Sequence, residues 1–389
     1  MTERRPGEYS IETLLASVAE GAGGAVVPPI VQTSLFAFDS YKAFEDRMAG
    51  RSDDPLYSRV QNPTVAAFED LIAAAEEGEA AVGFASGMAA ISSTVLALVR
   101  PGDRIACVEH VYPDAYRFFE RLLRPFGVEI TYHPVADFEN DPDLLDGVRL
   151  AYLESPNTVV FEAMDLPRVA AHARRHGTLT VIDNSWATPV FQRPLTLGVD
   201  IVLHSASKYL SGHSDTVAGV VVSSGELIGR IRDLSLSLLG GKLAPFEAFL
   251  LTRGLRTLGA RMRQHQSAAD RFVDNLSGHR LVKKVRSPGP NTVPGLTGRS
   301  GLLSVELDDI VSIPDFADAL KLFRLGVSWG GFESLVLPTQ IALNQSGEEN
   351  SLQRFGVSGR IVRLSLGLED PIDLWADFDA ALSLSAKQK

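Results

Sequence analysis

Short apolar runs that alternate with amphipathic stretches are the strongest constraint on the fold of this 389-residue chain. Such alternation is typical of a mainly parallel sheet covered by helices on both faces. Helix-like stretches such as residues 117–127 and 167–177 separate most of the runs. The pattern therefore predicts an α/β fold. The strand-like runs lie at residues 103–110, 128–135, 148–155, 179–185, 200–207 and 217–224.

The first 60 residues do not follow this pattern. They combine a proline-containing apolar stretch (VVPPIVQTSLFAF) with a charged one, so residues 1–60 are expected to form an arm with short helices. The regular pattern starts near residue 64, with a helix, a short apolar run and a second helix. We expect the large α/β domain to span residues 61–252.

The pattern changes again towards the C-terminus, and a chain of this length usually has more than one core. An amphipathic stretch near 245–278 precedes the apolar run GLLSVELDD, a helix near 314–325 and the alternating run GRIVRLSLGL. Residues 253–389 are therefore expected to form a smaller α+β domain.

Composition narrows the classes of function. The net charge is −11 without any run of Lys or Arg, which argues against generic binding to nucleic acids or anionic membranes. No apolar run reaches the ~18 residues that span a bilayer, and the N-terminus lacks the apolar core of a signal peptide. A single cysteine, Cys107, and eight histidines without an HExxH pattern predict neither a disulfide nor a metal site. We expect a cytoplasmic protein.

Two polar residues end strand-like runs that follow each other along the chain. Asp183 closes LTVID, and Lys208 follows DIVLHSAS. Ligands of open α/β sheets bind at the carboxyl ends of strands. A lone Asp there is more often a helix cap and a lone Lys a surface residue, but pyridoxal phosphate requires both an amine and a carboxylate.

The segment AVGFASGM could hold the phosphate of such a cofactor, because it passes from an apolar run through Ser-Gly into a helix opening at Met88. Free N–H groups at a helix start form an anion site. The bland alternative is an ordinary serine cap. Ser205 and Ser207 could donate hydroxyls to the same phosphate.

Two rival chemistries are disfavoured. Ser205-x-x-Lys208 has the spacing of a serine acyl-enzyme, but the accompanying Ser-Asp-Asn and Lys-Thr-Gly tripeptides do not occur. Residues 212–216 also lack the final glycine of a nucleophile elbow. The glycine-rich stretch GAGGAV lacks the third glycine of a dinucleotide fingerprint and follows no strand.

The chain resembles the Cys/Met-metabolism enzymes that use pyridoxal phosphate, the group of cystathionine lyases and synthases and methionine γ-lyase. The resemblance runs over nearly the whole chain and implies the aspartate-aminotransferase-like fold, fold type I of pyridoxal-phosphate enzymes, with a seven-stranded sheet. It rests on YSRVQNPT, ASGMAA, ESPN, VIDNSWATP, SASKYLSGHSD, RGLRTLGARMRQH, SWGGFESL and SGRIVRLSLGLED.

The resemblance implies a role for each matching cofactor residue. Lys208 binds the cofactor as a Schiff base and moves the substrate Cα proton, Asp183 keeps the pyridine nitrogen protonated, and Tyr112 stacks on the ring. The arm residues Tyr57 and Arg59 reach the phosphate in a neighbouring subunit, so the expected assembly is a homotetramer built from active dimers. The phosphate ligands implied within one subunit are Gly87, Met88, Ser205 and Ser207.

The resemblance also implies which residues bind the substrate, a small amino-acid thioether. Arg363 forks onto its α-carboxylate, and Ser328 and Asn157 complete the contacts. Trp329 follows Ser328, as in bacterial cystathionine β-lyases, where γ-type enzymes commonly have Leu. The implied reaction is β-elimination of L-cystathionine to homocysteine, pyruvate and ammonia, a step of methionine biosynthesis.

Three alternatives stay open. YSRVQNPT is closer to the γ-type enzymes, so a γ-lyase or γ-synthase remains possible on the sequence. A broader cysteine-conjugate β-lyase is the second alternative, because SLSLLGG lacks a tyrosine that many bacterial β-lyases have there. A cofactor-free scaffold is the third, and the intact Lys208, Asp183, Tyr112 and Arg363 argue against it.

Overall fold

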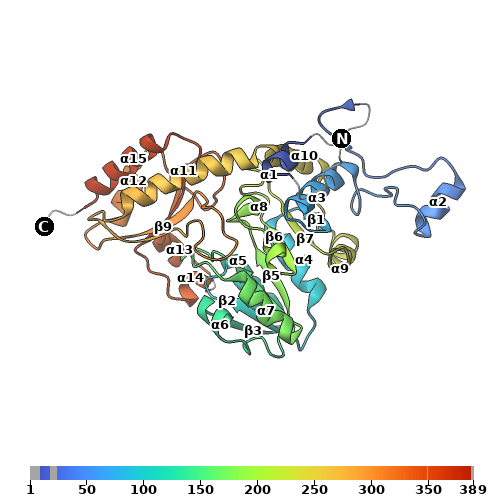
Figure 1. Ribbon diagram of the computed structural model, residues 1–389, viewed down its shortest axis with the longest axis horizontal. Coiled ribbons are helices and arrows are strands. Elements are labelled where there is room, and N and C mark those ends of the chain that lie inside the picture. The colour runs from blue at the N-terminus through green and yellow to red at the C-terminus, as the bar shows by residue number, and fades with distance from the viewer. Residues whose placement is uncertain (1–8, 18–23, 348, 387–389) are drawn as a thin grey trace.

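Two β-sheets organise the computed structural model, which describes residues 9–17, 24–347 and 349–386 (Figure 1). The predicted N-terminal arm and C-terminal domain therefore extend beyond the described residues at 1–8, 18–23 and 387–389. Among the described residues, no helix is long and apolar enough to cross a membrane. The expected domain limits at residues 60 and 252 stay predictions.

The larger sheet has seven strands in the order β1-β7-β6-β5-β4-β2-β3. Strand β7 is antiparallel to both neighbours, and the pairs from β6 to β3 are parallel. The predicted mainly parallel seven-stranded sheet is thus confirmed. The strands are β1 (Ala80–Phe84), β2 (Arg104–Val108), β3 (Glu129–His133), β4 (Leu150–Glu154), β5 (Leu179–Asp183), β6 (Ile201–His204) and β7 (Gly219–Ser223).

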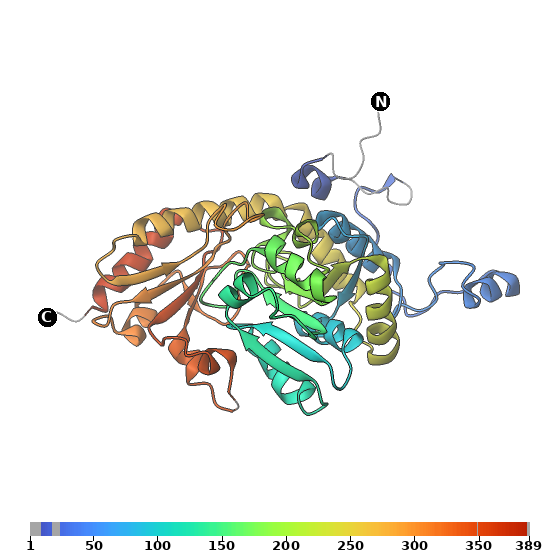
Figure 2. The ribbon, with the colours of Figure 1, turned by 60° about the horizontal axis from the view of Figure 1, so that its bottom comes forward.

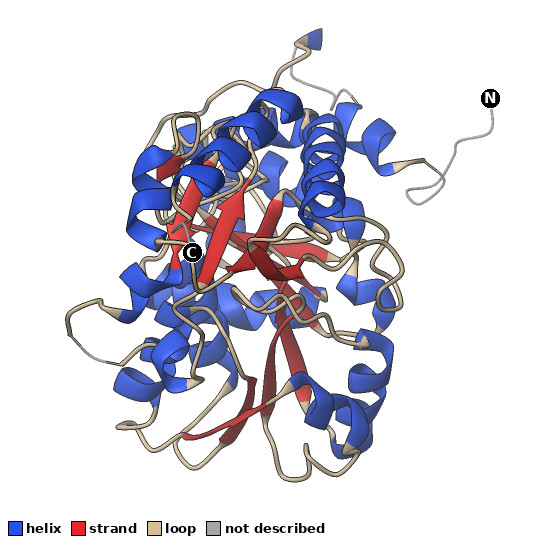
Figure 3. Cartoon of the chain, turned by 90° about the vertical axis from the view of Figure 1, so that its left-hand side faces the viewer, coloured by secondary structure: helices blue, strands red, loops and turns tan. Residues whose placement is uncertain are grey.

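Helices cover both faces of this sheet (Figure 3). Side chains of alternate strand residues enter different apolar clusters: Val181 packs with α4 and α5, whereas Ile182 packs with α7. Both faces are therefore buried, which explains the nearly continuous apolar runs. The helical segments around the sheet are α3 (Pro63–Ala75), α4 (Gly87–Leu98), α5 (Pro113–Phe118), η2 (Phe119–Leu123), α6 (Val135–Asn140), α7 (Leu166–His176), α8 (Thr188–Phe191), η3 (Pro194–Leu197), α9 (Gly225–Arg232), η4 (Asp233–Leu239) and α10 (Pro245–Arg256).

The helix predicted over 117–127 has different bounds. Helix α5 begins at Pro113, and the chain continues from Phe119 as a π-helical turn that ends at Leu123. Proline suits the first turn of a helix, where its missing N–H has no intrahelical partner. Tyr112 therefore lies at the helix start, next to the carboxyl edge of the sheet.

The smaller sheet has five strands in the order β10-β11-β12-β9-β8, and one of its faces packs on α11, α12 and α15. Helix α11 also contacts α8, so it links the two sheets, as Figure 2 shows. The elements are α11 (Leu258–Leu276), β8 (Val282–Arg286), β9 (Leu302–Leu307), α12 (Ile313–Ala319), β10 (Arg324–Leu325), β11 (Leu335–Pro338), α13 (Thr339–Leu343), α14 (Ser351–Arg354), β12 (Ile361–Ser365) and α15 (Pro371–Leu384).

The helix predicted near 314–325 was too long, because α12 ends at Ala319. The carboxylate of Asp377 on α15 accepts the backbone N–H groups of Lys321 and Leu322. These N–H groups therefore bind a side chain instead of a helix carbonyl, and the chain turns into β10.

Within the arm, the segment that carries α2 extends away from the main body, whereas α1 lies against it (Figure 1). Helix α1 (Ile11–Ala16) packs on α3, α10 and α11. Helix α2 (Tyr41–Met48) has no buried residue, and Tyr41 is 83% exposed. A short antiparallel contact between Leu35 and Tyr57 closes the base of the loop that carries α2. The described part of residues 1–60 thus contains two short helices, and its assignment as an arm stays a prediction.

Candidate active site

The carboxyl ends of β5 and β6 bring the two key polar residues to one edge. Asp183, the last residue of β5, is in register with Leu203 of β6. Lys208 follows β6 in a tight turn, in which its N–H donates to the carbonyl of Ser205 at 3.1 Å. Asp183 and Lys208 therefore lie at the same edge of the sheet and within electrostatic reach of each other, and their shared role in a site stays a prediction.

The amine of Lys208 has an environment that favours its neutral form. Burial lowers its pKa to about 8, Arg363 acts in the same direction, and Asp183 opposes both. The Nζ atom donates to Ser328 Oγ at 2.7 Å and lies 5.5 Å from the centre of the Trp329 ring. A free amine at moderate pH can act as a nucleophile or a base.

Asp183 is a half-buried carboxylate that accepts two hydrogen bonds from one residue. The Ser185 hydroxyl donates to Oδ1 at 2.5 Å, and the Ser185 N–H donates to the same oxygen at 2.9 Å. Burial raises the pKa of Asp183, whereas these bonds, His204 and Lys208 lower it. The carboxylate can hold a cationic nitrogen at this edge.

The start of α4 faces the turn that carries Lys208. Ser86 caps the helix by accepting the N–H of Ala89 at 3.0 Å. A Cβ atom on Gly87 would lie only 2.8 Å from Ser205 Oγ, so this approach requires glycine. The N–H groups of Gly87 and Met88 belong to the first turn, where anions bind. The structure thus brings the predicted phosphate residues Gly87, Met88 and Ser205 together.

The Ser207 hydroxyl already forms two hydrogen bonds within the chain. It donates to the Ala218 carbonyl at 3.1 Å and accepts the Ala218 N–H at 2.9 Å. These bonds tie the Lys208 turn to the strand β7 side of the sheet. Its expected role as a phosphate donor stays a prediction.

Tyr112 is anchored through its backbone. The Glu154 carboxylate accepts the Tyr112 N–H at 2.6 Å, and the Tyr112 hydroxyl donates to Asp114 Oδ2 at 3.0 Å. Burial raises the pKa of Tyr112, and the nearby carboxylates raise it further. Tyr112 therefore keeps its proton and presents a neutral ring to the site.

The small sheet supplies the wall opposite Lys208. Arg363 of β12 donates through Nη2 to the carbonyls of Val327 at 2.7 Å and Ser328 at 3.1 Å. Burial lowers the pKa of Arg363 to about 10, so it stays cationic at neutral pH. A Cβ on Gly330 would lie 2.8 Å from the Tyr209 nitrogen, which shows how closely the 328–331 loop approaches the lysine turn.

Asn157, which follows β4, is buried. Its Oδ1 accepts the N–H of Glu162 at 2.9 Å, and its Nδ2 donates to the Glu109 carbonyl at 3.4 Å. The side chain therefore holds the loop that follows β4. Its expected contact with cofactor or substrate stays a prediction.

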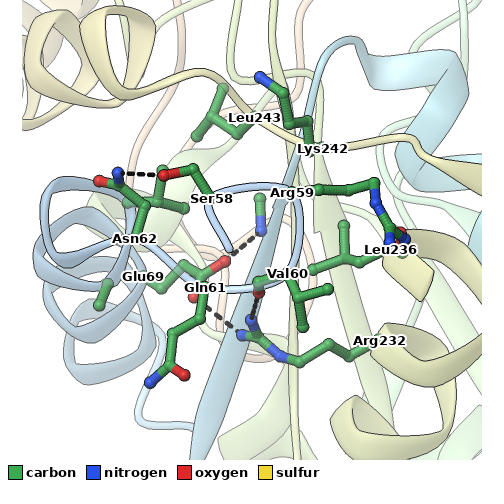
Figure 4. Close-up of a pocket in the computed structure, with 13 residues that line it drawn as sticks. Ser58, Arg59, Val60, Gln61, Asn62, Glu69, Arg232, Leu236, Lys242 and Leu243 are labelled. Atoms are coloured by element: carbon green, nitrogen blue, oxygen red, sulfur yellow. Dashed lines mark hydrogen bonds and ion pairs between the residues drawn. The ribbon is translucent and has the colours of Figure 1, made fainter. Parts of the chain in front are cut away.

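Tyr57 and Arg59 lie elsewhere on the chain. Arg59 donates to the carbonyls of Leu236 and Ser237 at 2.9 and 2.7 Å, and its guanidinium lies 5.8 Å from the Tyr57 ring centre. Arg59 lines a cavity of about 20 Å³ beside Lys242 (Figure 4). That volume suits about one water molecule, so this pocket is not a cofactor site.

Sequence reasoning missed two residues of the site, Glu154 and Ser185. Glu154 ends β4 directly beside Asp183 in the sheet, and burial followed by the Asp183 charge raises its pKa to about 8. A signal was present, since LAYLE ends in a carboxylate just as LTVID does. Ser185 gave no such signal, because its role depends on the side-chain direction.

The site fits pyridoxal phosphate. Three groups lie at one edge of the sheet: the Lys208 amine with its lowered pKa, the half-buried Asp183 carboxylate, and the start of α4, where a glycine allows Ser205 to approach closely. These are the three groups that the aldehyde, the pyridine nitrogen and the phosphate require. Among the described residues, no group of three or more His, Cys, Asp or Glu side chains is arranged to hold a metal ion.

Comparison with known proteins gives the family. The model of the Cys/Met metabolism PLP-dependent enzymes matches residues 13–383. L-methionine gamma-lyase of Pseudomonas putida is 38% identical over 374 residues, which cover 94% of each chain. Cystathionine beta-lyase of Lactococcus lactis subsp. cremoris is 36% identical over 371 residues, which cover 92% of this chain and 94% of that protein.

A solved structure is similar in fold as well. Cystathionine gamma synthase from Xanthomonas oryzae pv. oryzae, in complex with aminoacrylate and cysteine, has a TM-score of 0.87 and 33% identity and covers 97% of this chain and 98% of that one. The expected fold-type I architecture is confirmed, and the three relatives carry names of three different reactions. The chain belongs to the Cys/Met metabolism family of enzymes that depend on pyridoxal phosphate.

Proposed function

We propose that this chain cleaves the Cβ–S bond of L-cystathionine, converting L-cystathionine and water into homocysteine, pyruvate and ammonia. The observation that carries the proposal is the position of Trp329, whose ring lies 5.5 Å from Lys208 Nζ and 5.4 Å from the Tyr209 ring. A relative that is 36% identical is named cystathionine beta-lyase.

Substrate binding is assigned to the small-sheet wall. Arg363 is partly buried and cationic, and its planar guanidinium can form two parallel hydrogen bonds to an α-carboxylate. Its present partners are main-chain carbonyls of the 327–328 segment, which a carboxylate can outcompete because it carries a full charge. Ser328 provides a hydroxyl beside it.

Lys208 is assigned the proton transfers. It holds the cofactor at rest, and its free amine then removes the substrate Cα proton. The lowered pKa of about 8 lets the amine accept a proton near neutral pH and return it later. Pyridoxal phosphate, when bound, supplies the electron sink that makes this proton acidic. Asp183 maintains the positive charge on the pyridine nitrogen, and the Tyr112 ring limits the space above the site.

The position of Trp329 favours β- over γ-elimination. A β-elimination requires removal of one carbon-bound proton, at Cα, whereas a γ-elimination also requires one from Cβ. The Lys208 amine donates to Ser328 Oγ and lies 5.5 Å from the centre of the Trp329 ring, and we expect these two neighbours to restrict its reach along the substrate. One confined base suits the single proton transfer.

A second candidate is γ-elimination from a thioether such as methionine. A specific observation favours it, since the L-methionine gamma-lyase of Pseudomonas putida is 38% identical to this chain. The position that follows Tyr112 by two residues is Asp114, whose carboxylate binds the Tyr112 hydroxyl. A charged residue near an uncharged methylthio group is unfavourable, so we rank this candidate second.

We further propose that the active unit is a homodimer, paired into a tetramer, in the cytoplasm. The arm has an open apolar groove of about 630 Å³, and Tyr57 and Arg59 lie on the same segment. Apolar surface of this kind is typical of a protein–protein interface. A second copy seated on the arm would receive both residues at its site.

The test is a substrate panel with identification of the keto acid. L-cystathionine should give pyruvate and homocysteine, and L-methionine should give no methanethiol. Formation of 2-oxobutyrate and cysteine from L-cystathionine would contradict the β-lyase proposal and support the γ-type. Activity on many S-alkyl cysteines with little on cystathionine would indicate a broader cysteine-conjugate β-lyase.

A further inference from the structure

One hydroxyl joins the ends of β5 and β6 behind the cofactor residues. Ser185 Oγ donates to Asp183 Oδ1 at 2.5 Å and accepts the backbone N–H of Ser205 at 2.7 Å. Ser205 in turn opens the tight turn of Lys208, because its carbonyl accepts the Lys208 N–H. A single buried side chain thus connects the carboxylate to the turn that carries the phosphate serine and the lysine.

We propose that Ser185 is a positioning residue for the cofactor: its hydroxyl aims the Asp183 carboxylate and keeps the turn from Ser205 to Lys208 in register with it. The inference rests on the proposed function, since it takes Asp183 and Lys208 as the cofactor-binding pair. Ser185 itself needs no contact with cofactor or substrate for this role.

Only a hydroxyl can do both tasks at this point. The Ser205 N–H needs an acceptor, and the Asp183 oxygen needs a donor. Water has little access to replace either bond, because Ser185 is only 6% exposed. Removing the hydroxyl leaves a buried N–H without its partner, which costs about 1–3 kcal/mol in comparable proteins. The Ser185 N–H still binds Asp183, so the carboxylate loses part of its support and not all of it.

The same bond affects the charge of Asp183. Burial raises the pKa of this carboxyl, and the hydrogen bonds from Ser185 oppose that effect. Loss of the hydroxyl therefore moves the pKa of Asp183 in the cofactor-free protein upward. Because the cofactor nitrogen needs the ionised carboxylate, binding then weakens more at low pH than at high pH.

The opposite end of the same strand pair offers a matched control. Thr180 Oγ1 donates to Asp200 Oδ2 at 2.7 Å and accepts the Asp200 N–H at 2.8 Å. The pattern of donor, hydroxyl and carboxylate is the same, and Thr180 is just as buried. Thr180 lies near the amino end of β5, however, three residues before Asp183 at its carboxyl end.

The experiment compares Ser185→Ala, Ser185→Thr and Thr180→Val. For each, the dissociation constant of pyridoxal phosphate is measured by equilibrium dialysis at pH 6 and pH 8, and unfolding of the cofactor-free protein is followed in urea. Ser185→Ala should weaken cofactor binding about tenfold at pH 8 and more at pH 6. Ser185→Thr should restore binding, and Thr180→Val should lose stability without losing cofactor affinity.

Three results would overturn the inference. The first is wild-type affinity in Ser185→Ala at both pH values. The second is an equal loss in Thr180→Val, which would show general loosening of the strand pair. The third is failure of Ser185→Thr to restore binding. If Ser185→Ala does not fold, Ser185→Cys, with a weaker donor of similar size, should show an intermediate loss of affinity.

Failure of the proposed function has a different signature. In that case the wild-type protein itself would bind no pyridoxal phosphate or release no keto acid, whatever residue 185 is. A wild-type protein that binds and turns over while Ser185→Ala matches it would contradict only the role of Ser185.

Discussion

The edge that carries Asp183 and Lys208 and the arm that carries Tyr57 and Arg59 are built in opposite ways. At the edge, the two key polar groups have partners inside the chain: Ser185 binds Asp183, and Ser328 binds Lys208. On the arm, Tyr57 is 45% exposed and α2 has no buried residue. The first region is held together by hydrogen bonds within a single chain, and the second presents apolar surface to its surroundings.

The two regions should therefore contribute to function in different ways, one within a single chain and one through association with another chain. The buried edge sets the charge and direction of its side chains through bonds that do not depend on protein concentration. The arm can contribute to a site only where another surface meets it, so its effects should depend on association. Three predictions test that contrast, from the largest effect to the smallest.

Lys208→Ala should have the largest effect, because it removes both the covalent attachment and the base. We expect turnover to fall by about a thousandfold or more, since positioned acid–base groups alone contribute roughly 10²–10⁴. The measurement is keto acid release under saturating substrate and cofactor. Lys283→Ala, which removes a surface lysine paired with Asp309, is the control and should keep full activity.

Appreciable activity in Lys208→Ala would show that another group removes the proton. The loss relative to wild type should also be the same at every protein concentration, because the groups that contact the Lys208 side chain belong to its own chain. A loss that varied with dilution would break the contrast between edge and arm.

Much of the edge could be predicted from the sequence, and the reasons are physical. Parallel strands buried on both faces give apolar runs, so the ends of LTVID and IVLH were visible, and strand ends gather at one edge. The bounds of α12 could not be predicted, since Asp377, far along the chain, captures the N–H groups that end it. Local patterns do not contain such distant partners.

The individual residues of the site also divide into those that the sequence could predict and those that it could not. The eight motifs implied Lys208, Asp183 and Arg363, and the structure places Asp183 and Arg363 within electrostatic reach of Lys208. The hydrogen bonds of Ser185 and Glu154 depend on side-chain directions after folding, which no spacing rule gives. The roles of Tyr57 and Arg59 depend on a second chain, so a single chain shows only that both residues lie outside its own cofactor site.

Arg59→Ala should have the second-largest effect, a loss of cofactor affinity. If its guanidinium binds the phosphate in a partner subunit, removal of a charged hydrogen bond costs about 1.5–3 kcal/mol, or roughly ten- to a hundredfold in cofactor affinity. The measurement is the dissociation constant of pyridoxal phosphate. Arg47→Ala, which removes another arm guanidinium, is the control and should leave the affinity unchanged.

Mixed dimers give the sharper form of this prediction. A Lys208→Ala chain and an Arg59→Ala chain each spoil a different part of the site. If Arg59 acts in the partner, a mixed dimer contains one site with both residues intact, and random mixing should recover up to about a quarter of wild-type activity. No recovery after confirmed subunit exchange would show that Arg59 serves its own chain.

Glu154→Gln should have the smallest effect, which is on the pH dependence of stability. Glu154 lies at the buried edge, beside Asp183 in the sheet. Burial, then the charge of Asp183, raises the pKa of Glu154 to about 8, far above that of an unfolded chain. The folded protein therefore holds a proton at pH 7 that the unfolded chain does not, and this stabilising contribution is lost as pH rises through 8. From pH 7 to pH 8, the free energy of unfolding of the cofactor-free wild type should fall by about 1 kcal/mol, and that of Glu154→Gln should not show this fall.

Urea unfolding at both pH values and at two protein concentrations measures the difference. Glutamine is a suitable replacement because its amide oxygen can still accept the Tyr112 N–H. Equal pH dependence in both proteins would mean that Glu154 is ionised in the fold, and a difference that changed with concentration would place part of this edge under the control of a second chain.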